Sequence, residues 1–189
     1  MRFPIAIRIL LPFLVLGILL SACSKPAGSP SMLRGNRDLS TVSLRVERSD
    51  GAQIEGNFGT KEFTMKLDGA GKPEAIDLAI DIASLAFDDR DNKDTERLLS
   101  DDFLASTTNG VATFRSVSIE KMDNGFYRIE GSLKMNAIVK TVSFDADITT
   151  DRFTGKIPFN RRDFEIGNDI EHPVYTDAMS FGMDIVFSE

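Results

Sequence analysis

Cys23 has the most distinctive chemistry in the sequence, because it is the only cysteine among 189 residues. Ser21 and Ala22 stand directly before it, so the thiol follows two small residues. With no second cysteine the thiol cannot form a disulfide within the chain, and an unpaired thiol in an exported protein needs a specific chemical use. The interpretation of Cys23 therefore depends on whether the preceding residues direct export.

Residues 1–22 have the plan of a secretory signal peptide. Arg2 and Arg8 make the start positively charged, and Ile9–Leu20 is uncharged and mostly apolar. An apolar stretch of about a dozen residues lies within the range of signal peptides, and it is shorter than the roughly 20 residues that span a bilayer. We therefore expect residues 1–22 to be a signal peptide.

The end of this leader, Leu20–Cys23, resembles the lipobox of bacterial lipoproteins. The resemblance implies cleavage before Cys23 and attachment of a diacylglycerol, which carries acyl chains such as palmitate, to its sulfur. Two or more acyl chains hold a protein stably on a membrane, whereas one chain is marginal. Ser24 stands where enteric lipoproteins retained in the inner membrane have aspartate. The expected location is therefore the cell envelope, on the outer membrane facing the periplasm. The alternative is a plain signal peptide, or a membrane anchor, with an incidental cysteine.

Residues 23–189 fit a single acidic domain preceded by a tether. The formal net charge of the full chain is −7, which does not favour nucleic acid as a partner. Residues 24–39 are rich in proline, glycine and serine and lack periodicity, so we expect 23–40 to be a lipidated flexible tether. We expect the folded domain to occupy 41–189.

Apolar and polar residues alternate with a period of two through most of that domain. The clearest run is Ile76–Ile82, where isoleucine and leucine alternate with Asp77, Ala79 and Asp81. This pattern is typical of strands with one buried face. Turn dipeptides separate the runs, as in Asn124-Gly125. Eight or nine such strands fit a sandwich or a closed barrel, and closure removes exposed sheet edges.

We predict an all-β fold: an antiparallel, eight-stranded, lipocalin-like β-barrel. The segment Asp91–Phe103 departs from the alternation and predicts one short helix across a mouth of the barrel.

Three segments, in the same order, resemble the YceI-like family of bacterial lipocalin-like proteins. The similar residues are Ile80–Leu85 with Ser100–Phe103 and Ala112–Phe114, then Gly131–Val142, then Asn160–Phe164. Gly56 and Phe58 also match a Gly-x-Phe pattern near the family's start. The sequence departs from the family at Arg97, where the helix usually has histidine, and at Asn109-Gly110, where Tyr-Pro is usual.

The resemblance implies non-enzymatic binding of a long apolar lipid, such as a polyisoprenoid, inside the barrel, with a homodimer as a possible assembly. Aromatic residues expected inside are candidate ligand contacts, although a residue of this kind is more often plain core: Phe58, Phe63, Phe114, Phe144, Phe159 and Phe181. Arg161 and Arg162 either order a turn or meet a lipid head group. The alternative function is an envelope stress or interaction protein whose barrel is packed shut.

Catalytic and metal chemistry find little support in the sequence. The single histidine, His172, has no cysteine partner, whereas zinc sites use three or four ligands. The acidic run Asp88–Asp94 lacks the turn glycine and closing glutamate of an EF-hand loop. No Gly-x-Ser-x-Gly turn presents a nucleophile. We therefore expect no cofactor and no enzymatic activity.

Overall fold

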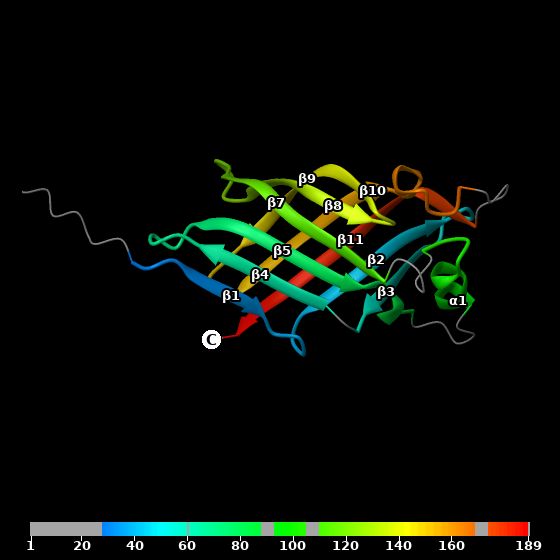
Figure 1. The fold of residues 1–189 in the computed structure, drawn as a ribbon, viewed down its shortest axis with the longest axis horizontal. Coiled ribbons are helices and arrows are strands. Elements are labelled where there is room, and N and C mark those ends of the chain that lie inside the picture. The colour runs from blue at the N-terminus through cyan, green and yellow to red at the C-terminus, as the bar shows by residue number, and fades with distance from the viewer. Residues whose placement is uncertain (1–27, 60, 88–92, 105–109, 169–173, 189) are drawn as a thin grey trace, which may run out of the picture.

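The computed structural model describes residues 28–59, 61–87, 93–104, 110–168 and 174–188. Within these ranges, eleven strand segments form one antiparallel sheet, which closes on itself where β1 pairs with β11 (Figure 1). The segments are β1 (Ser31–Gly35), β2 (Thr41–Arg48), β3 (Gln53–Phe58), β4 (Lys61–Leu67), β5 (Pro73–Asp81), β6 (Leu85–Phe87), β7 (Val111–Lys121), β8 (Tyr127–Met135), β9 (Ile138–Ile148), β10 (Arg152–Asn160) and β11 (Tyr175–Ser188).

The eleven segments make eight barrel strands, because three strands are each broken once. β1 and β2 both pair with β11, β4 and β3 pair with β1 and β2, and β5 and β6 pair with β4 and β3. The break between β5 and β6 is a 3₁₀ turn, Ile82–Ser84, and Gly59 donates its N–H to Ser84 O at the neighbouring break. The predicted all-β, eight-stranded antiparallel barrel with one short helix is confirmed.

The helix is shorter than predicted. Within the described residues α1 spans Lys93–Leu99, and the chain turns through Ser100–Leu104. Ser100 ends the helix, because its N–H donates to Arg97 O and its hydroxyl donates to the same carbonyl. Asp91, at the start of the predicted helix, lies outside the described residues, as do the leader, Cys23 and His172.

The predicted start of the domain at residue 41 is wrong, because the barrel begins further upstream. Ser31–Gly35 forms β1, which lies between β4 and β11 and closes the sheet. The segment satisfies its backbone hydrogen bonds on both sides, so a proline- and glycine-rich neighbourhood did not prevent strand formation. Residues 31–40 therefore belong to the barrel and not to a tether.

Inward-facing glycines make room for the phenylalanine rings that fill the barrel. A Cβ on Gly56 would lie 2.7 Å from the ring of Phe87, and one on Gly131 would lie 2.5 Å from the ring of Phe114. Both distances are shorter than carbon atoms tolerate, so these rings lie directly against bare backbone. The interior is consequently packed by aromatic rings that approach the barrel wall more closely than a side chain at those positions would allow.

The barrel has two different ends. One end, here called the helix end, carries α1 and the 3₁₀ turn η2 (Arg161–Phe164). The other, here called the hairpin end, carries the β4–β5 and β7–β8 turns together with the first described residues (Figure 1). No helix in the described ranges is long and apolar enough to cross a membrane.

Gly131→Ala should lower the free energy of unfolding by about 2 kcal/mol, because the added methyl group overpacks the interior against Phe114. Gly110→Ala is the matched control, since a methyl group there would have nothing within 4 Å and the residue needs no left-handed backbone. Urea unfolding followed by circular dichroism measures both. Equal stability of the two variants would contradict the packing described here.

Candidate functional site

The six phenylalanines expected inside the barrel are all buried, and they fall into groups. Phe181 contacts Phe58 and Phe159, with ring centroids 5.8 and 4.9 Å apart. Phe114 and Phe144 form a separate edge-to-face pair at 5.4 Å. Such pairs are stabilising beyond the area they bury.

The sixth ring, Phe63, contacts two interior phenylalanines that are not among the six predicted candidates. It contacts Phe153 and Phe187, with ring centroids at 4.9 and 6.0 Å. Phe153 has no solvent exposure and Phe187 very little. Both belong to alternating runs, so the period-two pattern contained the signal that could have found them.

The helix end of the barrel is closed by apolar side chains. Leu98 of α1 has no exposed surface, and Phe103 and Leu104 just after the helix are also buried. From the other side of the mouth come Phe164 of η2 and Ile166. A crevice of only about 10 Å³ remains where Leu104 and Ile166 meet the barrel wall, which is too small for a lipid chain.

A buried polar contact holds α1 in this position. The hydroxyl of Tyr175 donates to Asp94 Oδ1 at 2.5 Å, and Arg48 Nη1 lies 3.4 Å from Asp94 Oδ2. Thr95 Oγ1 accepts a hydrogen bond from the N–H of Phe87, at the end of β6. Burial, reinforced by the adjacent Asp94 carboxylate, raises the pKa of Tyr175 well above its ordinary value. Two consecutive residues of the helix are thereby tied to different strands.

Arg161 is fully buried at the same end and orders the turn after β10. Its Nη1 donates to the carbonyl oxygens of Ile166 and Gly167 at 2.7 and 2.8 Å, and its Nη2 lies 2.7 Å from Asp177 Oδ1. Burial lowers the pKa of Arg161, and the Asp177 carboxylate opposes that effect. The exposed Arg162 binds the second oxygen of Asp177. The contacts of Arg161 are those of a turn-forming residue.

The hairpin end is less completely covered. Leu33, Leu67, Ile119 and Ile148 are inward-facing, because each pairs with a buried residue across the sheet, yet all four are only partly buried. Pairing places their side chains on the interior face. Ile54 and Ile138 at the helix end are inward-facing and partly buried as well, so what distinguishes the hairpin end is that no helix or 3₁₀ turn of the described residues covers it.

Neighbouring strands also separate at this end. β5 and β7 pair over Asp77–Asp81 and Val111–Arg115, and then the Ser116 hydroxyl accepts the N–H of Ile76 at 2.8 Å in place of a backbone oxygen. A bulge at Val117 follows, and the two strands diverge towards their hairpins (Figure 1). A hollow of about 500 Å³ lies there, lined by Pro73, Ala75 and Ile119 together with four charged residues, Lys66, Asp68, Lys72 and Glu74.

The β9–β10 pair also has a short ladder, which ends at Ala146 and Gly155, in this case towards the helix end. There Asn136 Nδ2 donates to Phe164 O at 3.0 Å, so the β8–β9 turn is tied to η2. Of the two separations, the one between β5 and β7 therefore lies at the hairpin end.

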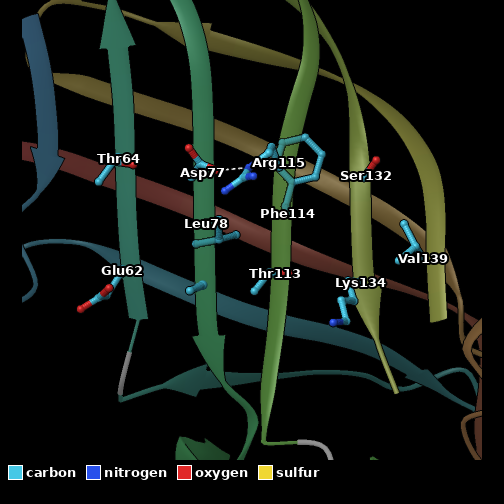
Figure 2. A pocket seen from close by; sticks show the side chains of 11 residues that line it. Glu62, Thr64, Asp77, Leu78, Thr113, Phe114, Arg115, Ser132, Lys134 and Val139 are labelled. Carbon is cyan, nitrogen blue, oxygen red and sulfur yellow. Dashed lines mark hydrogen bonds and ion pairs between the residues drawn. The ribbon is translucent and has the colours of Figure 1, made fainter. Parts of the chain in front are cut away.

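Two further hollows lie on the outer wall of the barrel and beside α1. One of about 420 Å³ crosses β4, β5, β7, β8 and β9 (Figure 2). There Arg115 forms an ion pair with Asp77 at 2.6 Å, and both side chains are well exposed. Another, of about 700 Å³, is bordered by charged residues of α1, including Glu96 and Arg97. Both hollows include exposed charged side chains, whereas the barrel interior is lined by apolar side chains.

The part of the chain that the structure describes contains no cluster of three or more His, Cys, Asp or Glu side chains able to hold a metal ion. The interior is instead lined by apolar side chains from every strand. An arrangement of this kind can bind a ligand through apolar contact and shape.

The YceI-like domain model matches residues 36–187, most of the barrel. The chain belongs to the YceI-like family. A UPF0312 protein of Shewanella oneidensis is 25% identical over 140 residues, which cover 69% of this chain and 73% of that protein.

Two solved structures have the same fold. The structure of Burkholderia cenocepacia BcnA matches with a TM-score of 0.72 and 22% identity, covering 82% of this chain and 99% of BcnA. A polyisoprenoid binding domain from Saccharophagus degradans, implicated in plant cell wall breakdown, matches with a TM-score of 0.59 and 11% identity, covering 83% and 97%. The proposed resemblance to the YceI-like family is thus confirmed.

Segments that resemble the YceI-like family meet at the helix end. Asn160 Oδ1 accepts the N–H of Arg162 at 2.9 Å and so begins η2, while Asn136 binds the carbonyl at the end of the same turn. This use of asparagine as an N-cap is common. These motif residues therefore build and close one end of the barrel.

Tyr175→Phe should destabilise the protein by about 2 kcal/mol at neutral pH, because a buried hydrogen bond to a charged group is lost. A tyrosine whose pKa is raised on folding stabilises the fold while protonated, and this contribution decreases as the pH rises above about 10, the unfolded value. Wild-type unfolding free energy should therefore fall more steeply above that pH than that of Tyr175→Phe.

Urea unfolding from about pH 8 to pH 11 tests this difference. Tyr127→Phe, which leaves the Tyr175–Asp94 hydrogen bond intact, should retain the steep decline. Parallel pH profiles for wild type and Tyr175→Phe would contradict the assignment.

Proposed function

We propose that this YceI-like protein binds a long apolar lipid, such as an isoprenoid, inside its barrel and carries or buffers it without catalysis. The observation that carries the proposal is an apolar interior that α1 and η2 cover at the helix end and that no helix or 3₁₀ turn of the described residues covers at the hairpin end. An eight-stranded barrel can be filled by its own side chains or hold one small ligand. The unequal ends favour the second use.

The energetics of such binding need no charged contact. Each buried methylene contributes about 0.8 kcal/mol, so a chain of several isoprene units would bind tightly by burial alone. The S. degradans structure described as a polyisoprenoid binding domain supports this ligand class, because the two barrels share a fold. Interior methionines such as Met65, Met179 and Met183 add side chains that adapt easily to a bound chain.

The location we propose is the cell envelope, where an acyl anchor on Cys23 would hold the protein on the outer membrane. The support is the sequence before Cys23 and the absence of any other cysteine. A lipid-binding barrel so anchored would work next to the source of its ligand.

Replacing the anchor residue tests this location. Cys23→Ala should leave an uncleaved, unlipidated precursor, because the thiol that accepts the diacylglycerol is missing. Ser24→Ala is the control and should be processed normally. Membrane fractionation and intact-mass measurement distinguish the products. Normal cleavage and membrane retention of Cys23→Ala would contradict lipidation at this cysteine.

Binding itself is tested on the purified protein. Solvent extraction and mass spectrometry should recover an apolar lipid from wild type, and octaprenol should bind from detergent micelles. Ile148→Lys should weaken octaprenol binding at least about tenfold, because it places a charge inside the mouth, where an apolar chain would have to cover it.

Val139→Lys is the matched control for Ile148→Lys, because Val139 is exposed on the opposite face of the same strand. It should bind like wild type. Equal loss in both variants, or no binding by wild type, would overturn the proposal.

A packed barrel with an interaction role is the second candidate. The ring contacts between Phe58, Phe159 and Phe181 favour it, since these aromatics fill the interior against one another. Under the first proposal the rings must move aside for a ligand, as side chains with two rotatable bonds can. Failure of wild type to carry or take up any lipid would leave this second function as the better one.

A further inference from the structure

We propose that the hairpin end of the barrel rests on the surface of a lipid bilayer, and that the apolar ligand enters there, beside the separation between β5 and β7. The proposal rests on the proposed lipid-binding function and adds the orientation of the barrel and the route of the ligand. The partner that we propose for the surface of the hairpin end is the lipid bilayer itself.

The first support is the position at which the chain enters the barrel. The N–H of Gly28 donates to Gly69 O at 2.7 Å, so the backbone is held against the β4–β5 turn at the hairpin end. Cys23 stands five residues earlier. Even a fully extended chain covers only about 18 Å over that interval, at roughly 3.6 Å per residue. An acyl group on Cys23 would therefore keep the hairpin end close to the membrane and leave α1 on the far side.

The second support is the apolar surface at this end. The side chain of Phe126, in the β7–β8 turn, is 45% exposed although it is large and aromatic. Met32 on β1 and Val117 at the β7 bulge are exposed as well. Apolar side chains of this kind enter the boundary between head groups and acyl chains when they lie against a bilayer. The exposed apolar residues are thus placed where the anchor would bring the membrane.

The third support is the way into the interior. The partly buried mouth residues and the divergence of β5 from β7 lie at the same end as Phe126, whereas the helix end is closed by Leu98, Phe103 and Phe164. Ile119 borders the hollow between the diverging strands and faces the interior beside Ile129. A chain leaving the bilayer would pass the charged side chains that line this hollow together with Pro73 and Ala75, and would then meet Ile119 and the apolar interior.

Orientation is tested with the full lipidated chain in vesicles of phosphatidylethanolamine and phosphatidylglycerol. Lipidation uses the only natural cysteine, so Phe126→Cys and Val111→Cys each provide one thiol for an environment-sensitive fluorophore. Val111 is the control because it is 54% exposed but lies on β7 near the helix end. The label at 126 should shift its emission to the blue, and the label at 111 should not. No shift at 126, or equal shifts at both positions, would overturn the orientation.

The route is tested with photoactivatable octaprenol in the same vesicles, by following its light-induced cross-linking to interior strands over time. Phe126→Ser should slow loading about tenfold, because it removes the contact that seats the mouth on the bilayer, and Val111→Ser should load like wild type. In detergent micelles all three proteins should reach the same extent of cross-linking. Unchanged loading of Phe126→Ser from vesicles overturns this inference alone, whereas no cross-linking of wild type in either medium overturns the proposed function and the inference with it.

Discussion

The contact between phenylalanine rings and bare glycine backbone is the interaction on which the barrel depends. An eight-stranded barrel has a narrow interior, so large rings fit only where the barrel wall has glycine, which has no side chain. Gly56 lies under Phe87, Gly131 under Phe114, and Gly155 lies near the rings of Phe144 and Phe153. These rings supply much of the buried area that stabilises the fold. Each also turns about only two side-chain bonds, so a packed interior and one that admits a chain differ in ring position and not in composition.

Polar contacts fix one end of this apolar cylinder and leave the other free. At the helix end Arg161 satisfies two backbone carbonyls and Asp177, while Tyr175 binds Asp94. Buried charges of this kind are costly unless they are paired, so moving α1 away from Tyr175, or η2 away from Asp177, would break these contacts and leave a buried polar group without its partner. At the hairpin end the inward residues are aliphatic side chains and rings such as those of Phe153 and Phe187, and the ion pair of Lys66 with Glu74 is exposed and so stabilises little. Opening the barrel should therefore require least free energy at the hairpin end.

The alternation of the sequence predicts the strands and their inward faces because a buried strand face needs an apolar residue at every second position. It does not predict β1, whose five residues contain only Met32 and Leu33 as large apolar side chains and follow a proline- and glycine-rich stretch. Nor does it predict the breaks that divide three strands, since these depend on how neighbouring strands fit around a closed barrel. Arginine is usually a surface residue, so the sequence does not predict that Arg161 is buried. It is buried because the fold places a backbone carbonyl and the carboxylate of Asp177 next to its guanidinium group.

The sequence also does not predict whether a ligand could reach the candidate site inside the barrel. The buried phenylalanines follow from the binary pattern, but a barrel with two closed ends and a barrel with one open end share that pattern. What distinguishes them is where the backbone ladder stops. Between β5 and β7 the backbone ladder stops where the hydroxyl of Ser116 accepts the hydrogen bond from the N–H of Ile76, one residue before the bulge at Val117. A serine and a bulge inside a long strand look ordinary in the sequence, yet together they turn β7 away from β5 and leave a hollow beside Ile119. Under the proposed function, access to the barrel would therefore depend on the register of these two strands and on where it ends.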